Sequence, residues 1–192
     1  MSKAVLQGNA SGTGVVTLQT PNTNTDRTIT LPDADGTVVI ANGSGYITAP
    51  SNPAFTAQIN GNSDATYSSG SNIPFNITGY NRGSNFNTST YAFTAPVAGV
   101  YLFSAALYLT SSSGFTSNYQ FGIVKNGSFP TFGGLDNVAV ANASPNGNGG
   151  TVEATVTVVL NLAVGDTVAV QPRSASLRVY QGHCYFTGCL IG

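Results

Sequence analysis

Charged side chains are scarce in this 192-residue sequence. They make up 7% of the residues, six Lys and Arg against seven Asp and Glu, whereas a typical globular chain has about 25%. The net charge is −1 and no basic run occurs, so the sequence lacks the electrostatic footprint of proteins that bind nucleic acid or an anionic membrane surface. We therefore expect no nucleic-acid partner.

Long apolar runs are also missing. No stretch approaches the roughly 20 apolar residues that span a membrane as a helix. The opening residues Met1–Gly8 contain no apolar core of the length that a secretory signal needs. We expect a protein that is made in the cytoplasm and does not insert into a membrane.

Histidine, the commonest general acid or base, occurs once. The strand expected at the C-terminus places His183 facing away from the core, with no acidic residue near it in sequence. The fold could bring Asp136 or Glu153 close to it, but a structural or subunit-interface role for His183 is the simpler interpretation. We expect no catalytic residues and no enzymatic activity.

The two cysteines are five residues apart in the same expected strand. Cys184 and Cys189 would lie on opposite faces with about 16 Å between their Cα atoms, too far for a disulfide bond. With one neighbouring histidine and no further cluster of ligands, they also make a poor zinc site. We expect two free thiols.

Two short motifs resemble binding loops without completing them. Asp33-Ala34-Asp35-Gly36 begins like a calcium loop, but the remaining ligands do not follow, so a tight turn is expected. Gly12-Thr13-Gly14 lacks the third glycine and the helix of a dinucleotide fingerprint. The sequence therefore predicts no bound metal and no cofactor.

What the sequence does contain is a strong β signal. Hydrophobic residues make up 41% of the chain, and β-branched and aromatic types alternate in short runs without the spacing of an amphipathic helix. Nine or ten short strands in about 140 residues predict an all-β jelly-roll β-sandwich. The expected strands are Phe55–Ile59, Ile73–Ile77, Phe86–Phe93, Gly99–Leu109, Asn118–Lys125, Leu135–Ala141, Thr151–Leu160, Asp166–Gln171, Leu177–Tyr180 and His183–Ile191.

The composition divides the chain into two parts. Residues 1–50 contain no Phe and predict three short strands, Val15–Leu18, Thr28–Leu31 and Thr37–Ile40, followed by a linker rich in Gly, Ser and Pro. Three strands of about four residues bury too little apolar surface to fold alone. We expect residues 1–50 to be a β anchor that docks on a partner, and residues 53–192 to be the main domain.

The main domain resembles the globular head of the first complement component, a jelly roll similar to tumour necrosis factor. Seven of eight positions carry the resemblance: Phe75, Asn81, Phe86, Phe93, Gly99, Tyr101 and Phe103. The eighth position is Ala105, where the family has an aromatic residue. Pro53–Ala57 looks like the family's first strand and Phe186–Leu190 like its last. The resemblance implies a homotrimer with aromatic residues along its axis. No Gly-X-Y repeat of a collagen stalk accompanies it.

The N-terminal part resembles a segment common in tailed-bacteriophage virion proteins, especially fibres and surface appendages. Gly14–Pro21 and Thr28–Val39 carry this resemblance. It implies that residues 1–50 attach the protein to a phage capsid or tail protein.

Together these features predict a bacteriophage virion structural protein, a trimeric appendage at the virion surface. It could be a capsid decoration or head fibre, or a short tail fibre that binds the host. The alternative is a free bacterial carbohydrate- or protein-binding module. Aromatic and Arg side chains could hold a host glycan or protein, or could instead be core and trimer contacts: Tyr67, Tyr80, Arg82, Phe115, Tyr119 and Phe132.

Overall fold

The computed structural model describes residues 24, 52–110, 119–127, 129, 138–143, 150–173 and 176–192. The chain divides into two units, Met1–Ile40 and Ala41–Gly192, and every element below belongs to the second. The strands expected within residues 1–50 lie outside the described residues. The N-terminal anchor and the domain boundary near residue 53 therefore stay predictions.

The regular secondary structure of the described residues in the second unit is almost entirely β. Their one helical element is the 3-10 turn η1 (Gln181–His183), and no helix among them is long and apolar enough to cross a membrane. The strands are β1 (Ala54–Gln58), β2 (Asp64–Ser68), β3 (Ile77–Arg82), β4 (Phe86–Asn87), β5 (Ala92–Thr94), β6 (Gly99–Thr110), β7 (Tyr119–Lys125), β8 (Val138–Ala143), β9 (Thr151–Leu162), β10 (Thr167–Pro172), β11 (Ser176–Tyr180) and β12 (Tyr185–Leu190).

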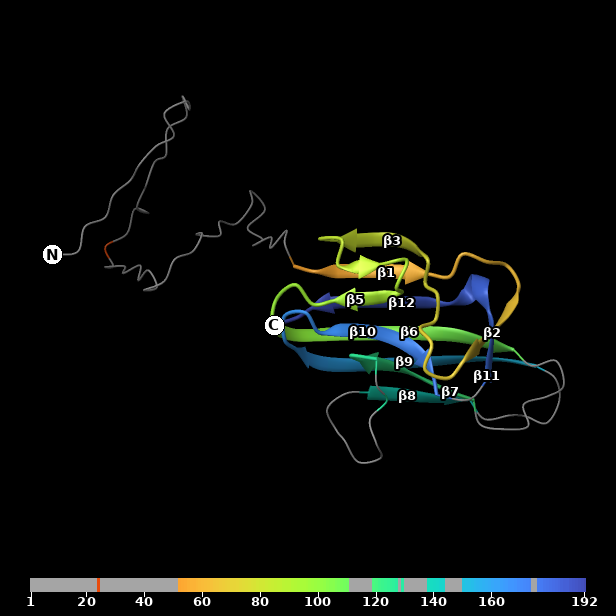
Figure 1. Ribbon diagram of the computed structural model, residues 1–192. Helices are drawn as coiled ribbons and strands as arrows, with labels where there is room; N and C mark the ends of the chain where they lie inside the picture. The colour runs from red at the N-terminus through yellow and green to blue at the C-terminus, as the bar shows by residue number, and fades with distance from the viewer. Residues whose placement is uncertain are drawn as a thin grey trace, which may run out of the picture. The chain divides into compact units, whose positions relative to one another are not determined.

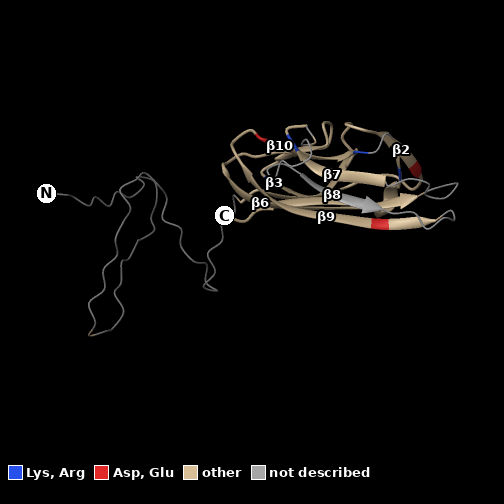
Figure 2. Ribbon diagram, turned by 90° about the horizontal axis from the view of Figure 1, so that it is seen from below, with Lys and Arg blue, Asp and Glu red and all other residues tan. Residues whose placement is uncertain are grey.

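These strands form two antiparallel sheets (Figure 1). The seven-stranded sheet has the order β2–β11–β6–β12–β1–β3, with β9 also paired to β6, and the five-stranded sheet has the order β4–β5–β10–β7–β8. Figure 2 shows the two layers edge on, with β7 and β10 in one and β6 and β9 in the other. The long strand β6 organises the larger sheet, because it pairs with β9 over its whole length and with β12 over Tyr101–Ala106.

Aromatic side chains from both sheets fill the space between them. Phe55 of β1 lies among Phe86 and Phe93 of the smaller sheet, at ring-centroid distances of 4.6 and 5.4 Å, and Phe186 of β12, at 4.9 Å. All four rings are buried. Each such pair contributes about 0.5–1.5 kcal/mol beyond the burial of its area, so the aromatic cluster holds the two sheets together.

The positions that carried the sequence resemblance have structural roles. All five aromatic rings at these positions are buried: Phe75, Phe86, Phe93, Tyr101 and Phe103. Asn81 receives the backbone N–H of Phe86 at 3.1 Å and donates its amide to the Phe86 carbonyl at 2.8 Å, which fixes the start of β4. Ala105, the position without the expected aromatic ring, is also fully buried. The predicted jelly-roll β-sandwich is confirmed.

Three details of the predicted elements were wrong. Residues 73–76 of the expected strand Ile73–Ile77 are irregular, since Pro74 has no N–H for a sheet and Phe75 bonds back to Ile73. Residues 86–93 form two strands, because the Asn87 side chain accepts two backbone N–H groups and closes a turn. His183 lies in η1 and not in the last strand, which begins at Tyr185.

A polar network ties two turns of the sandwich together. The Asp166 carboxylate accepts hydrogen bonds from the Asn126 amide at 2.9 Å and the Ala163 N–H at 2.8 Å, and forms an ion pair of 2.7 Å with Lys125. Asn126 in turn accepts the N–H of Thr167 at 2.8 Å. These donors, led by Asn126, lower the pKa of Asp166 from its ordinary value of 3.8 to about 2.

Asp166→Asn is therefore expected to make the protein modestly less stable at neutral pH. The lowered pKa means that ionised Asp166 stabilises the fold above pH 4, and that this contribution disappears as the pH falls towards 2. Because the turn is solvent-exposed, the effect is about 1 kcal/mol or less. Urea unfolding at pH 7 and pH 2 checks it: the difference between wild type and variant shrinks at the lower pH, and an equal difference at both contradicts the assignment.

Candidate binding site

An open hollow of about 470 Å³ lies where β6 ends and β9 begins. Small-ligand sites in proteins range over about 300–1,000 Å³. The side chains that define the hollow come from β2, β6, β9, β11 and η1: Asp64, Tyr108, Thr110, Thr151, Tyr180 and His183. Segments far apart in the sequence thus contribute to it within a single chain.

The hollow is at the distal end of the domain, opposite the end where the chain enters. At the entry end, Leu190 donates its N–H to the carbonyl of Pro53, and Val100 donates to the carbonyl of Gly192. Strand β6 runs from that end to Thr110. Its twelve residues span about 35 Å, at a rise of about 3.3 Å per residue. Figure 1 shows the same arrangement, with the C-terminus and the start of β1 at one end and β2 and β11 at the other.

Three aromatic rings pack against one another at the hollow. Tyr108 and Tyr180 are 6.2 Å apart between centroids, and the His183 ring is 5.1 Å from Tyr108 and 5.2 Å from Tyr180. The rings meet edge to face, at interplanar angles of 63–80°. Hydrogen bonds also fix the two tyrosine hydroxyl groups, because Tyr108 donates to Thr151 Oγ1 at 3.0 Å and Tyr180 donates to Asn62 Oδ1 at 2.6 Å.

Among the described residues, Asp64 is the one acidic residue that lines the hollow. One carboxylate oxygen accepts the Thr110 hydroxyl at 2.8 Å, and the other accepts Arg178 Nη2 at 2.7 Å. The carboxylate is therefore fixed in place from both sides. Each of its oxygens keeps a lone pair for a further hydrogen bond.

The buried thiol of Cys184 lies beneath the aromatic rings. Cys184 Sγ accepts the backbone N–H of Tyr108 at 3.4 Å and donates to the carbonyl of Tyr180 at 3.2 Å. Burial raises the pKa of Cys184 to about 11, so the thiol stays protonated and unreactive at neutral pH. Both cysteines are free, as predicted, but they do not share a strand as expected, because Cys184 lies between η1 and β12.

The sequence pointed to His183 but not to its neighbours. Of the two acids considered for it, Asp136 lies outside the described residues, and Glu153 is exposed on β9 without lining the hollow. The acid that shares the hollow with His183 is Asp64, from β2. Among the described residues no group of three His, Cys, Asp or Glu side chains could hold a metal ion.

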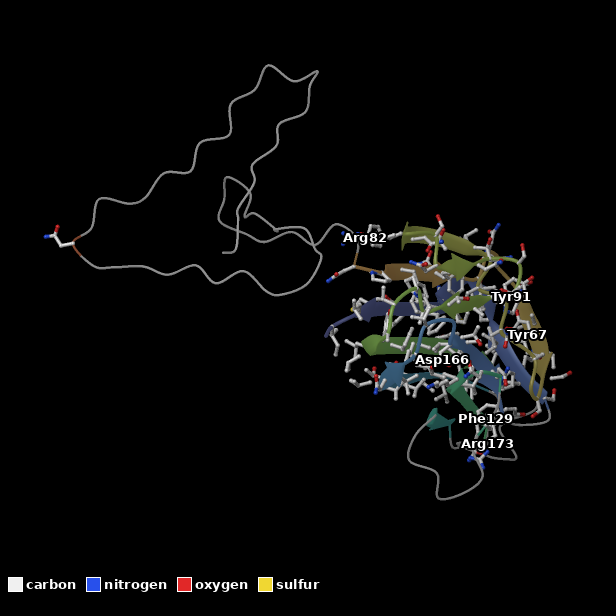
Figure 3. All side chains as sticks on the ribbon, turned by 60° about the vertical axis from the view of Figure 1, so that its left-hand side comes forward. Tyr67, Arg82, Tyr91, Phe129, Asp166 and Arg173 are labelled. Carbon is white, nitrogen blue, oxygen red and sulfur yellow. The ribbon has the colours of Figure 1, made fainter. Side chains whose placement is uncertain are left out.

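The candidate anchors for a host glycan or protein do not converge on one site. Tyr67 is half-buried, accepts a hydrogen bond from Gln181 at 3.1 Å and has a pKa raised by burial. The Arg82 guanidinium lies over the ring of Tyr80, 5.4 Å from its centroid, and Figure 3 shows Arg82 and Tyr67 towards opposite ends of the domain. Tyr119 packs against the core, and Phe115 and Phe132 lie outside the described residues.

The outward face of the larger sheet is a second candidate surface. At its centre, the row formed by Val159, Leu102, Cys189 and Ala54 runs across β9, β6, β12 and β1. The next row is hydroxyl-rich, with Ser104 and Thr157 hydrogen-bonded at 2.9 Å. From the end of the domain where β1 begins as far as Glu153, no outward residue of these four strands carries a charge. Glu153 is the single acidic residue of β9 (red in Figure 2). We call this surface the neutral face.

Comparison with known proteins identifies the domain. A family model described as the C1q domain matches residues 54–191, more than half of the chain. The chain belongs to the C1q-domain family. No protein with a curated description of its function matches it.

Solved structures show the same fold as this C1q domain. The globular domain of zebrafish complement 1qA is 22% identical, with a TM-score of 0.55, over 73% of this chain and 98% of that one. Eiger TNF from S. frugiperda is 13% identical with a TM-score of 0.53 (73% and 93% covered), and murine APRIL is 10% identical with a TM-score of 0.54 (73% and 99% covered). The predicted likeness to the complement head and to tumour necrosis factor is confirmed for the fold.

Proposed function

We propose that this chain is a structural protein of a tailed-bacteriophage virion, a homotrimeric surface appendage without enzymatic activity. Residues 53–192, the C1q head, project from the particle, and residues 1–50 attach the trimer to a capsid or tail protein. The protein is made in the host cytoplasm and is located at the virion surface. Its function depends on its shape and its assembly, and not on a reaction with a substrate.

The observation that carries the assembly is the neutral face. A desolvated charge without a partner destabilises an interface by several kcal/mol, and the neutral face contains none. Its exposed apolar side chain, Val159, is 55% accessible to solvent in the single chain. Closing a threefold ring on this face removes such side chains from water.

Attachment to a virion is supported by the resemblance of Gly14–Pro21 and Thr28–Val39 to phage virion segments. Short β strands of this kind can extend the sheet of a partner, with main-chain hydrogen bonds supplying affinity. The head would then stand with its distal hollow outward, because the chain enters the C1q domain at the opposite end.

Immunogold labelling of purified particles tests the virion role. Antibody against the C1q head is expected to label intact particles from a lysate of the source host. Label confined to the tail excludes the capsid decoration and head-fibre roles and leaves the tail fibre. Particles that bind no gold, with the protein present only in the soluble fraction, contradict the proposal.

The alternative is a free bacterial carbohydrate- or protein-binding module. The distal hollow favours it, since a C1q head with a ligand site needs no virion. This alternative predicts that the protein occurs away from any particle and that ligand binding survives loss of residues 1–50.

A further inference from the structure

We propose that the distal hollow is a binding site for a neutral saccharide. The proposal deepens the proposed function, because it names what the head of the appendage would hold on a host surface. It needs only one chain, since Asp64, Tyr108, Thr151, Tyr180 and His183 all belong to the same C1q domain.

The aromatic rings suit a flat, partly apolar ligand. Tyr108, Tyr180 and His183 touch one another edge to face, with centroids 5.1–6.2 Å apart, so no space remains between the rings. A cage for a quaternary ammonium ion needs rings that stand apart around the cation. Rings packed together instead offer their outer faces, on which the C–H face of a sugar can lie.

The polar groups around the rings match the hydroxyl groups of a sugar. Asp64 keeps one lone pair on each carboxylate oxygen, so it can accept two hydroxyl protons. Thr151 Oγ1 accepts the Tyr108 hydroxyl and keeps its own proton to donate. A sugar hydroxyl both donates and accepts, and therefore satisfies either kind of group.

The charge in the hollow disfavours other ligands of similar size. Asp64 is the single formally charged residue among the described lining residues, and Arg178 pairs with it at 2.7 Å, so the hollow offers no unpaired positive charge to attract a phosphate or an acidic sugar. Among the described lining residues, only Asp64 and His183 are of the types that commonly bind metals, too few for a cation site.

The side chains are held in position before any ligand arrives. The Cys184 thiol links the backbone of Tyr108 to that of Tyr180, and hydrogen bonds fix both tyrosine hydroxyls. Asp64 is fixed by Thr110 and Arg178. Little conformational entropy is then lost when a ligand binds, which favours affinity for a small ligand.

The position of the hollow leaves it accessible in a trimer built on the neutral face. Tyr108 is registered opposite Glu153, the charge that ends the neutral face, and Thr110 and Thr151 lie farther along the same strands. The hollow is therefore beyond the surface that the trimer would bury.

Saturation-transfer NMR on the full-length protein tests the proposal. The probes are the methyl glycosides of D-glucose, D-galactose, D-mannose and N-acetyl-D-glucosamine, each added alone. We expect saturation transfer to at least one of them, with a dissociation constant on the order of 1 mM, as the size of a monosaccharide allows. His183→Ala removes an exposed ring and Asp64→Asn removes the charge at constant shape; each is expected to weaken binding about tenfold.

Ile77→Ala is the control, because it removes a partly exposed apolar side chain from β3, outside the hollow, and should leave saturation transfer unchanged. Circular dichroism verifies that each variant is folded. Transfer to none of the four glycosides overturns the proposal, and so does binding that both hollow variants retain or that tetramethylammonium displaces. Gold-labelled particles without sugar binding would overturn the saccharide site alone, whereas sugar binding without labelled particles would overturn the virion role alone.

Discussion

Gly188→Ala is expected to lower the free energy of unfolding by about 1–3 kcal/mol, the range for an overpacked core. A Cβ at Gly188 would lie 2.4 and 2.6 Å from ring atoms of Phe103 and 2.8 Å from the ring of Phe55. Neither ring can move away, because both are buried among Phe93 and Phe186. Urea unfolding at matched chain concentration measures the change.

The control for this prediction is Gly79→Ala on β3, where an added Cβ meets no atom within 4 Å. Its free energy of unfolding should change little. The double variant Gly188→Ala/Phe103→Leu should lose less stability than the sum of the two single variants, since the smaller side chain relieves the contact. A Gly188→Ala protein as stable as the wild type would show that the rings of Phe103 and Phe55 do not pack over Gly188 as described.

Val159→Lys is expected to convert the proposed trimer to monomers. Val159 is in the central row of the neutral face, with Leu102 and Cys189, so three unpaired ammonium groups would be buried in one assembly. Leaving a charge unpaired in an interface costs about 3–5 kcal/mol, and the trimer contains three copies. Size-exclusion chromatography with light scattering measures the loss of trimer.

Val164→Lys is the matched control, because it introduces the same charge at a turn between β9 and β10 where the side chain is 67% exposed. This variant should remain trimeric. If Val159→Lys keeps the mass of the wild type and stays folded, the neutral face is not the subunit interface, and the assembly must use another surface.

The strands with clear alternation of apolar and polar residues could be predicted from the sequence. Gly99–Leu109 and Thr151–Leu160 correspond to β6 and β9 within two residues, since one buried face imposes a period of two on a strand. The number of short strands predicted the jelly roll. The family resemblance rested in part on Phe75, Asn81 and Phe86, on which the core and the start of β4 depend.

The missed elements give only a weak signal. β2 (Asp64–Ser68) alternates, but its apolar positions are a single Ala and a single Tyr that are only half-buried, and it pairs with β11 more than a hundred residues away. The turn η1 interrupts an apolar segment and has no buried residue of its own. In both places tertiary pairing, which a local pattern does not encode, decides the structure.

The hollow could be predicted only in part, for the same reason. His183 was singled out as the one histidine, and Tyr108 follows from the period of β6 as an outward residue. That Asp64, Tyr180 and Thr151 meet them depends on the order of strands β2, β11, β6 and β9. The neutral face was more accessible from sequence, because only 7% of the residues are charged, so most outward positions of the strands had to be neutral.

The measurement that tests the central claim most directly is the native mass of the purified full-length protein by light scattering, under reducing conditions because both cysteines are free. The account predicts a mass of three times 19.6 kDa, independent of dilution over the micromolar range. A monomer of 19.6 kDa would contradict it, and would leave a single C1q domain with a distal hollow in place of a trimeric virion appendage.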